Sequence, residues 1–124
     1  MNTLNRVVLL VSFFVIASCG GGGGGGGSED SYTPPAQTNG APTITNTVFN
    51  ISVQENQTSA FTISASDPDG DSLTYSLSGT DSALLSVSSS GVVTFNTAPD
   101  YENPSDSNAD NVYGVTATVS DGSL

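Results

Sequence analysis

Residues 61–77 read FTISASDPDGDSLTYSL, and this stretch decides the fold of the chain. Apolar side chains alternate with small polar ones on both sides of an acidic bend, at Phe61, Ile63 and Ala65 and again at Leu73, Tyr75 and Leu77. A period of two is typical of half-buried strands. Pro68 and Gly70 favour a tight turn between them. The stretch therefore predicts a strand, an acidic turn and a second strand.

The same alternation recurs along the chain from Pro42 onward, and helical spacing is absent there. Further runs of this kind are Phe49–Val53, Leu84–Val87, Val92–Phe95 and Tyr113–Val119. Six short strands with frequent turns predict an all-β Greek-key β-sandwich. Such a sandwich normally has seven strands, so we expect the final strand to be missing and the strand at Tyr113–Val119 to present an unprotected edge.

The N-terminal region has the composition of an export leader. Arg6 precedes an apolar stretch of 11 residues, Val7 to Ala17, which is too short to span a bilayer. Its end, Ile16-Ala17-Ser18-Cys19, resembles the bacterial lipobox, in which a cysteine is diacylated and becomes the first residue of the mature protein. The resemblance implies a signal peptide at 1–18, a lipid anchor at Cys19, and a place in the cell envelope at the outer membrane or cell surface. An ordinary secretory leader is the alternative.

Residues 19–40 are expected to form a disordered, glycine-rich linker ahead of a folded domain at 41–124. Eight consecutive glycines, Gly20 to Gly27, have no side chain to bury and the largest backbone entropy to lose. A phosphate-binding loop is the other use of such a run, but it would need a preceding strand and a following helix or lysine. The segment is therefore predicted to be a spacer.

The charge of the chain excludes several classes of function. Twelve acidic residues stand against a single basic one, Arg6, and the formal net charge is −11. Nucleic acids and anionic membrane surfaces are consequently poor partners. The sequence has no histidine and no lysine, which removes the usual general base, the usual zinc ligand and the Schiff-base amine. We expect that the protein is not an enzyme.

The bend itself carries three carboxylates, Asp67, Asp69 and Asp71, within five residues. Two unscreened carboxylates about 4 Å apart repel by about 4 kcal/mol near a protein surface. Beyond the leader the chain has no positive side chain to offset this repulsion, and hard oxygen ligands suit calcium. Plain turn chemistry is the alternative. An EF-hand does not fit, because Ser72 and Ser78 occupy the positions that need glycine and glutamate.

Four segments of residues 39–124 together resemble a cadherin or cadherin-like repeat. These segments are Val53-Gln54-Glu55-Asn56, Ala65 to Gly70, Asp100-Tyr101-Glu102 and Ala117 to Gly122. The resemblance implies calcium at the junctions between repeats, with ligands at two poles of the domain. It places Glu55, Asp100 and Glu102 at one pole, and Asp67, Asp69 and Asp121 at the other. An Ig-like or dystroglycan-type domain shares the pattern of Asp67 to Leu77 but does not account for Asp100-Tyr101-Glu102.

The chain departs from the cadherin pattern where the family has an acidic linker, because it reads Gln37-Thr38-Asn39-Gly40-Ala41 there. Both sites therefore lack part of the calcium ligands of the family, and we expect weak affinity for calcium, about 10⁻⁴ to 10⁻³ M or poorer. The expected function is that of a membrane-anchored surface module for adhesion or matrix contact, through homophilic or heterophilic protein contacts. The alternative is a passive stalk of a larger lipoprotein that carries a catalytic or carbohydrate-binding domain further along.

Overall fold

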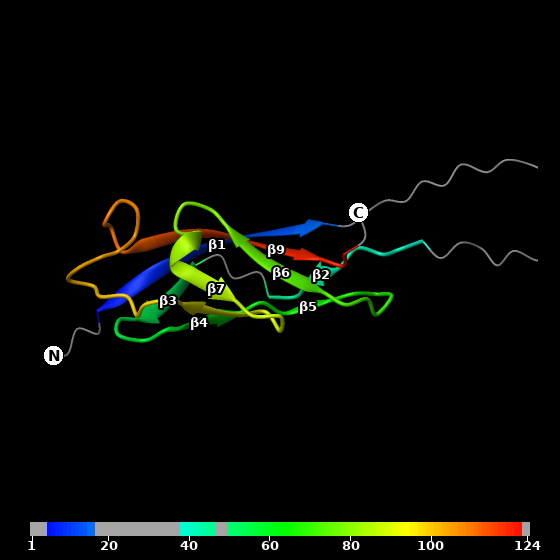
Figure 1. Cartoon of the computed structure of the whole chain (residues 1–124), viewed down its shortest axis with the longest axis horizontal. Coiled ribbons are helices and arrows are strands. Elements are labelled where there is room, and N and C mark those ends of the chain that lie inside the picture. The colour runs from blue at the N-terminus through cyan, green and yellow to red at the C-terminus, as the bar shows by residue number, and fades with distance from the viewer. Residues whose placement is uncertain (1–4, 17–37, 47–49, 123–124) are drawn as a thin grey trace, which may run out of the picture.

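A computed structural model of the chain describes residues 5–16, 38–46 and 50–122 (Figure 1). Within these ranges the chain forms strands and one three-residue 3-10 helix, and no helix is long and apolar enough to cross a bilayer. The elements are β1 (Arg6–Ile16), β2 (Thr43–Ile44), β3 (Asn50–Gln54), β4 (Ser59–Thr62), β5 (Ala65–Ser66), β6 (Thr74–Ser78), η1 (Ser82–Leu84), β7 (Leu85–Val87), β8 (Val92–Phe95) and β9 (Val112–Ser120).

The strands form two main sheets, which confirms the predicted β-sandwich. One sheet has the order β3-β1-β9-β6 and the other has the order β4-β8-β7. β2 and β5 make a separate two-stranded pair. The pairings are antiparallel except for that of β1 with β9, which is parallel.

The core lies between the two main sheets and follows the alternation seen in the sequence. Tyr113, Val115, Ala117 and Val119 of β9 are all buried, as the period of two predicts. Val93 and Phe95 of β8 face them from the other sheet. The rings of Phe95 and Tyr113 meet edge to face, with their centroids 5.1 Å apart. This contact joins the two sheets near the start of β9.

The predicted strand at Phe61–Ala65 divides into two short strands in different sheets. β4 ends at Thr62 and pairs with β8, whereas β5 begins at Ala65 and pairs with β2. Between them, the Ile63 amide donates to the Gly91 carbonyl at 2.8 Å, and the Ser64 amide donates to the Asn46 side chain at 2.7 Å. These two hydrogen bonds fix the segment in which the chain crosses from one sheet to the other.

The expectation of an unprotected edge at Tyr113–Val119 is wrong, because β1 covers it. β1 pairs with β9 from Val8 opposite Val112 to Ile16 opposite Ser120, and its other edge pairs with β3. Figure 1 shows β1 (blue) running beside β9 (red). An apolar run rich in valine suits a buried strand as well as a leader, so its composition alone did not separate the two uses. The folded unit thus includes residues outside the predicted range 41–124.

The register of the sheet defines two ends of the molecule. The end of β3 and the starts of β1 and β9 lie together, and we call this end the Glu55 pole. The end of β9 lies beside the start of β6, because Ser120 pairs with Thr74, and we call this end the Asp67 pole. At about 3.3 Å per residue, β9 separates the poles by roughly 30 Å.

Candidate functional site

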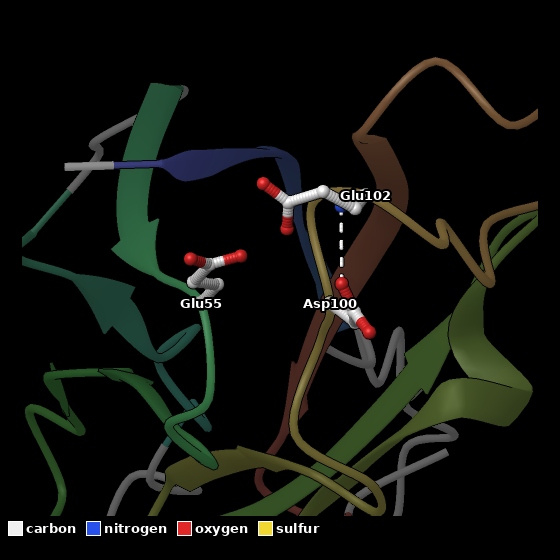
Figure 2. A group of neighbouring side chains, drawn as sticks. All are labelled: Glu55, Asp100 and Glu102. Carbon is white, nitrogen blue, oxygen red and sulfur yellow. Dashed lines mark hydrogen bonds between the residues drawn. The ribbon is translucent and has the colours of Figure 1, made fainter. Parts of the chain in front are cut away.

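Three carboxylates meet at the Glu55 pole, and they come from two segments distant in sequence. Glu55 directly follows β3, whereas Asp100 and Glu102 lie in the loop between β8 and β9. One carboxylate oxygen from each of the three lies within 4.8 Å of the others. Figure 2 shows Glu55 facing this loop from the end of β3. The structure therefore brings together the three residues that the resemblance assigned to one pole.

Backbone amides hold the carboxylates of Glu55 and Asp100 in place, and the side chain of Asn5 donates to the third carboxylate, Glu102. The amide of Tyr101 donates to Glu55 at 3.1 Å, and the amide of Glu102 donates to Asp100 at 3.0 Å, the dashed line in Figure 2. The Asn56 amide donates to the Pro99 carbonyl at 2.8 Å and joins the two segments. Because the backbone fixes the segments, the three carboxylates stay close despite their mutual repulsion.

The donor set suits a calcium ion. Calcium binds oxygen ligands at about 2.3–2.6 Å, so ligands on opposite sides of one ion are about 5 Å apart. The spacing of 4.8 Å or less between the three oxygens falls within that limit. Glu55 is half-buried, whereas Asp100 and Glu102 are exposed, so the protein would cover one side of the ion and leave the other open.

At the Asp67 pole, Asp67 organises the acidic bend through its side chain. Its Oδ1 accepts hydrogen bonds from the amides of Asp69 and Asp71, at 2.8 and 3.2 Å. Its Oδ2 is buried and has no hydrogen-bond partner among the described residues. Gly70 supplies the positive φ, +81°, that the bend requires. The bend is thus a well-made turn that leaves one buried carboxylate oxygen unsatisfied.

Residues 38–40 belong to this pole, although the sequence predicted a linker there. The side chain of Asn39 donates to Asp121 at 2.6 Å, and the amide of Gly40 donates to Asp69 at 2.5 Å. A polar cavity lies between this segment and the bend, lined by Thr38, Asn39, Asp69 and Asp71. A Cβ atom at Gly40 would lie 2.5 Å from Pro68, so only glycine lets the segment approach the bend so closely.

The two poles differ in how closely their carboxylates approach each other. Within residues 5–16, 38–46 and 50–122, only the Glu55 pole gathers three acidic side chains near enough for one ion. Asp69 and Asp121 are instead linked through Asn39 and Gly40. Cys19 lies outside the described residues, as does most of the predicted linker.

Two buried aspartates were missed by the sequence reasoning, and both serve the fold. Asp81 accepts hydrogen bonds from the amides of Ser107 and Gly114, at 2.8 and 2.7 Å. Asp106 accepts from the amides of Asp110 and Asn111, at 2.9 and 3.2 Å. Neither residue stands in a recognisable acidic motif, and burial of a loop aspartate leaves no mark in the local sequence. Both bind backbone amides within the protein.

Comparison with protein families matches residues 26–124 to the bacterial Ig domain. A search of the curated proteins and of the solved structures finds no match. Bacterial Ig-like domains are often surface-associated or spacer modules, and they are generally non-catalytic. They are commonly extracellular or surface-exposed. The β-sandwich and the family match over most of the chain agree, and the protein belongs to the bacterial Ig domain family.

Proposed function

We propose that this protein is a calcium-binding surface module of the cell envelope, held to the membrane through a lipid on Cys19, that makes adhesive or matrix contacts. The observation that carries the calcium proposal is the meeting of Glu55, Asp100 and Glu102 within 4.8 Å at one pole. Its support is that the chain beyond the proposed leader has no lysine, arginine or histidine, which leaves a cation from solution as the natural counter-charge. The cadherin-like motifs add to this support.

The ion would act by tying loops together. It would join the end of β3 to the loop between β8 and β9 and cancel the repulsion among three carboxylates. Three ligands are few for calcium, which takes six to eight oxygens, so water or a neighbouring domain would supply the rest. Where a neighbouring domain supplies them, the ion fixes the angle between two domains and makes the array rigid.

A second candidate function is that of a passive spacer. It is favoured by the Asp67 pole, where Asn39 and Gly40 already occupy Asp121 and Asp69 through hydrogen bonds. Asp69 and Asp121 therefore need no ion, although one buried oxygen of Asp67 has no hydrogen-bond partner among the described residues. In this case the domain would only hold a partner domain away from the membrane, as spacer modules of the family do.

Thermal unfolding of the full chain in calcium, in magnesium and in chelator separates these functions. We expect millimolar calcium to raise the Tm by several degrees, and magnesium to raise it less, because magnesium gives up its water reluctantly. Glu102→Gln should abolish the calcium-specific part. Asp71→Asn is the matched control, since it removes one exposed carboxylate at the other pole and should keep the response.

Equal shifts with both ions, or equal loss in the two variants, would mean that the ions only screen the net charge of −11. That result would reject the calcium site and leave the spacer function. A calcium-specific shift lost only in Glu102→Gln would support the ion at the Glu55 pole.

A further inference from the structure

β1 lies inside its sheet, although its sequence also has the composition of a leader. It pairs antiparallel with β3 from Arg6 opposite Gln54 to Leu10 opposite Asn50. It pairs parallel with β9 along nine residues, Val8 to Ile16. Both neighbouring strands therefore use one edge to bind a segment that export would remove.

The packing of β1 is one-sided and deep. Val7, Leu9 and Val11 are at most 2% exposed and belong to the core, whereas Leu10 is 43% exposed and Phe14 is 58% exposed. Without β1, the inner faces of β3 and β9 would lose these three contacts, and nine residues of β9 would have an unpaired edge. Such an edge beside an open apolar slot binds extended polypeptide readily.

We propose that the slot between β3 and β9 is a strand-accepting site. β1 fills it in the uncleaved chain, and an extended strand of a partner polypeptide fills it once the leader has been removed. The removal of the leader is part of the proposed function, and this inference rests on it. The partner strand runs parallel to β9, places apolar side chains at three alternate positions, and begins with a basic residue.

The negative charge of the Glu55 pole is the reason why we expect the partner strand to begin with a basic residue. Arg6, the only cation of the chain, begins β1 beside Gln54, the residue that precedes Glu55. The carbonyl of Asn5 accepts a hydrogen bond from the Glu55 amide at 3.2 Å, and the Asn5 side chain donates to Glu102. The first residues of the bound strand thus lie at the acidic pole and contact the carboxylate of Glu102, and the negative charge there favours a positive charge at the start of the strand and steers it into one orientation.

Strand exchange in the full chain tests the site. A protease site placed within Gly20–Gly27 allows the chain to be cut after folding, in chelator, so the result depends neither on calcium nor on natural processing. We expect the leader fragment to remain bound through gel filtration after the cut. A fluorescent peptide of residues 5–12, which holds Val7, Leu9 and Val11, should then displace it.

Two peptide variants make the test specific. Leu9→Asp places a charge in the core and should weaken binding at least about 30-fold. Leu10→Asp is the matched control, because Leu10 points outward, and it should bind within about threefold of the parent peptide. Equal binding of the two variants would overturn the proposal. It would also be overturned if the leader fragment left at once and the remaining body kept the same thermal unfolding.

Discussion

Asp81 joins three parts of the molecule through one side chain. It follows β6, accepts hydrogen bonds from the Ser107 loop and from Gly114 of β9, and its own amide donates to the Gly114 carbonyl at 3.1 Å. Only 4% of the residue is exposed. A charged side chain at this depth is tolerated because backbone amides satisfy both of its oxygens.

Replacing this side chain should cost a large part of the stability of the domain. Asp81→Ala leaves two part-buried amides, those of Ser107 and Gly114, without their acceptor, and we expect the free energy of unfolding to fall by about 3 kcal/mol. The free energy of unfolding of Asp81→Asn should lie between those of the original protein and Asp81→Ala, because the amide oxygen of asparagine can still accept one of the two hydrogen bonds. Urea unfolding followed by tyrosine fluorescence measures both variants.

The neighbouring residue provides the control. Thr80 is exposed, and Thr80→Ala should change the free energy of unfolding by no more than about 0.5 kcal/mol. If Asp81→Ala lost as little as Thr80→Ala, the hydrogen bonds of Asp81 would contribute nothing to stability, contrary to the role inferred here.

At the level of strands, alternation predicted most of the fold. The runs at Tyr113–Val119 and Val92–Phe95 are β9 and β8, and Leu73–Leu77 is nearly β6. Periodicity succeeds there because one face of each strand is buried and the other is not. Periodicity failed where tertiary contacts decide the secondary structure. Leu84 was predicted to lie in a strand but lies in η1, and the apolar run of β1 fits an export leader and a buried strand equally well.

The candidate site was predictable in part for the same reason. The residues of the Glu55 pole stand at strand ends, in segments that resemble known motifs, so their meeting could be anticipated. The place of Asn39 could not be, because its partner Asp121 is 82 residues away and the contact depends on the folded path of the chain.

Alanine substitutions at Gly91 and Gly70 test how closely the turn before β8 packs on its neighbours. Gly91 and Gly70 have the same φ, +81°, but a Cβ atom at Gly91 would lie 2.6 Å from the Ile63 carbonyl oxygen, whereas nothing lies within 4 Å at Gly70. Alanine at Gly70 should cost about 1 kcal/mol from backbone strain alone. Alanine at Gly91 should cost about 2 kcal/mol more, because the backbone must move.

The difference between the two variants isolates the steric contribution, since the backbone strain is common to both. Chemical denaturation in chelator gives both values without interference from bound ions. Equal losses would show that the segment around Ile63 adapts freely, and that the crossing from β4 to β5 is less tightly fixed than its hydrogen bonds indicate.

In the part of the molecule that the structure describes, negative charge is concentrated at two ends, and the strands between them carry no acidic residue. β1, β9 and the strands of the second sheet contain no acidic residue, whereas the loops at the poles contain most of them. A separation of roughly 30 Å exceeds the Debye length of about 8 Å at physiological ionic strength by several times. The poles should therefore behave as independent electrostatic units under those conditions.

A double-mutant cycle tests this independence. Glu102→Gln at one pole and Asp71→Asn at the other should have additive effects on the free energy of unfolding, within about 0.5 kcal/mol, at 0.15 M salt in chelator. At about 0.01 M salt the Debye length grows to about 30 Å, and a measurable coupling should emerge because both changes relieve the same long-range repulsion. Coupling that is large at 0.15 M and does not change with salt would contradict the electrostatic explanation. It would mean instead that the two loops are linked mechanically through β9, so that loosening one end alters the packing of the other.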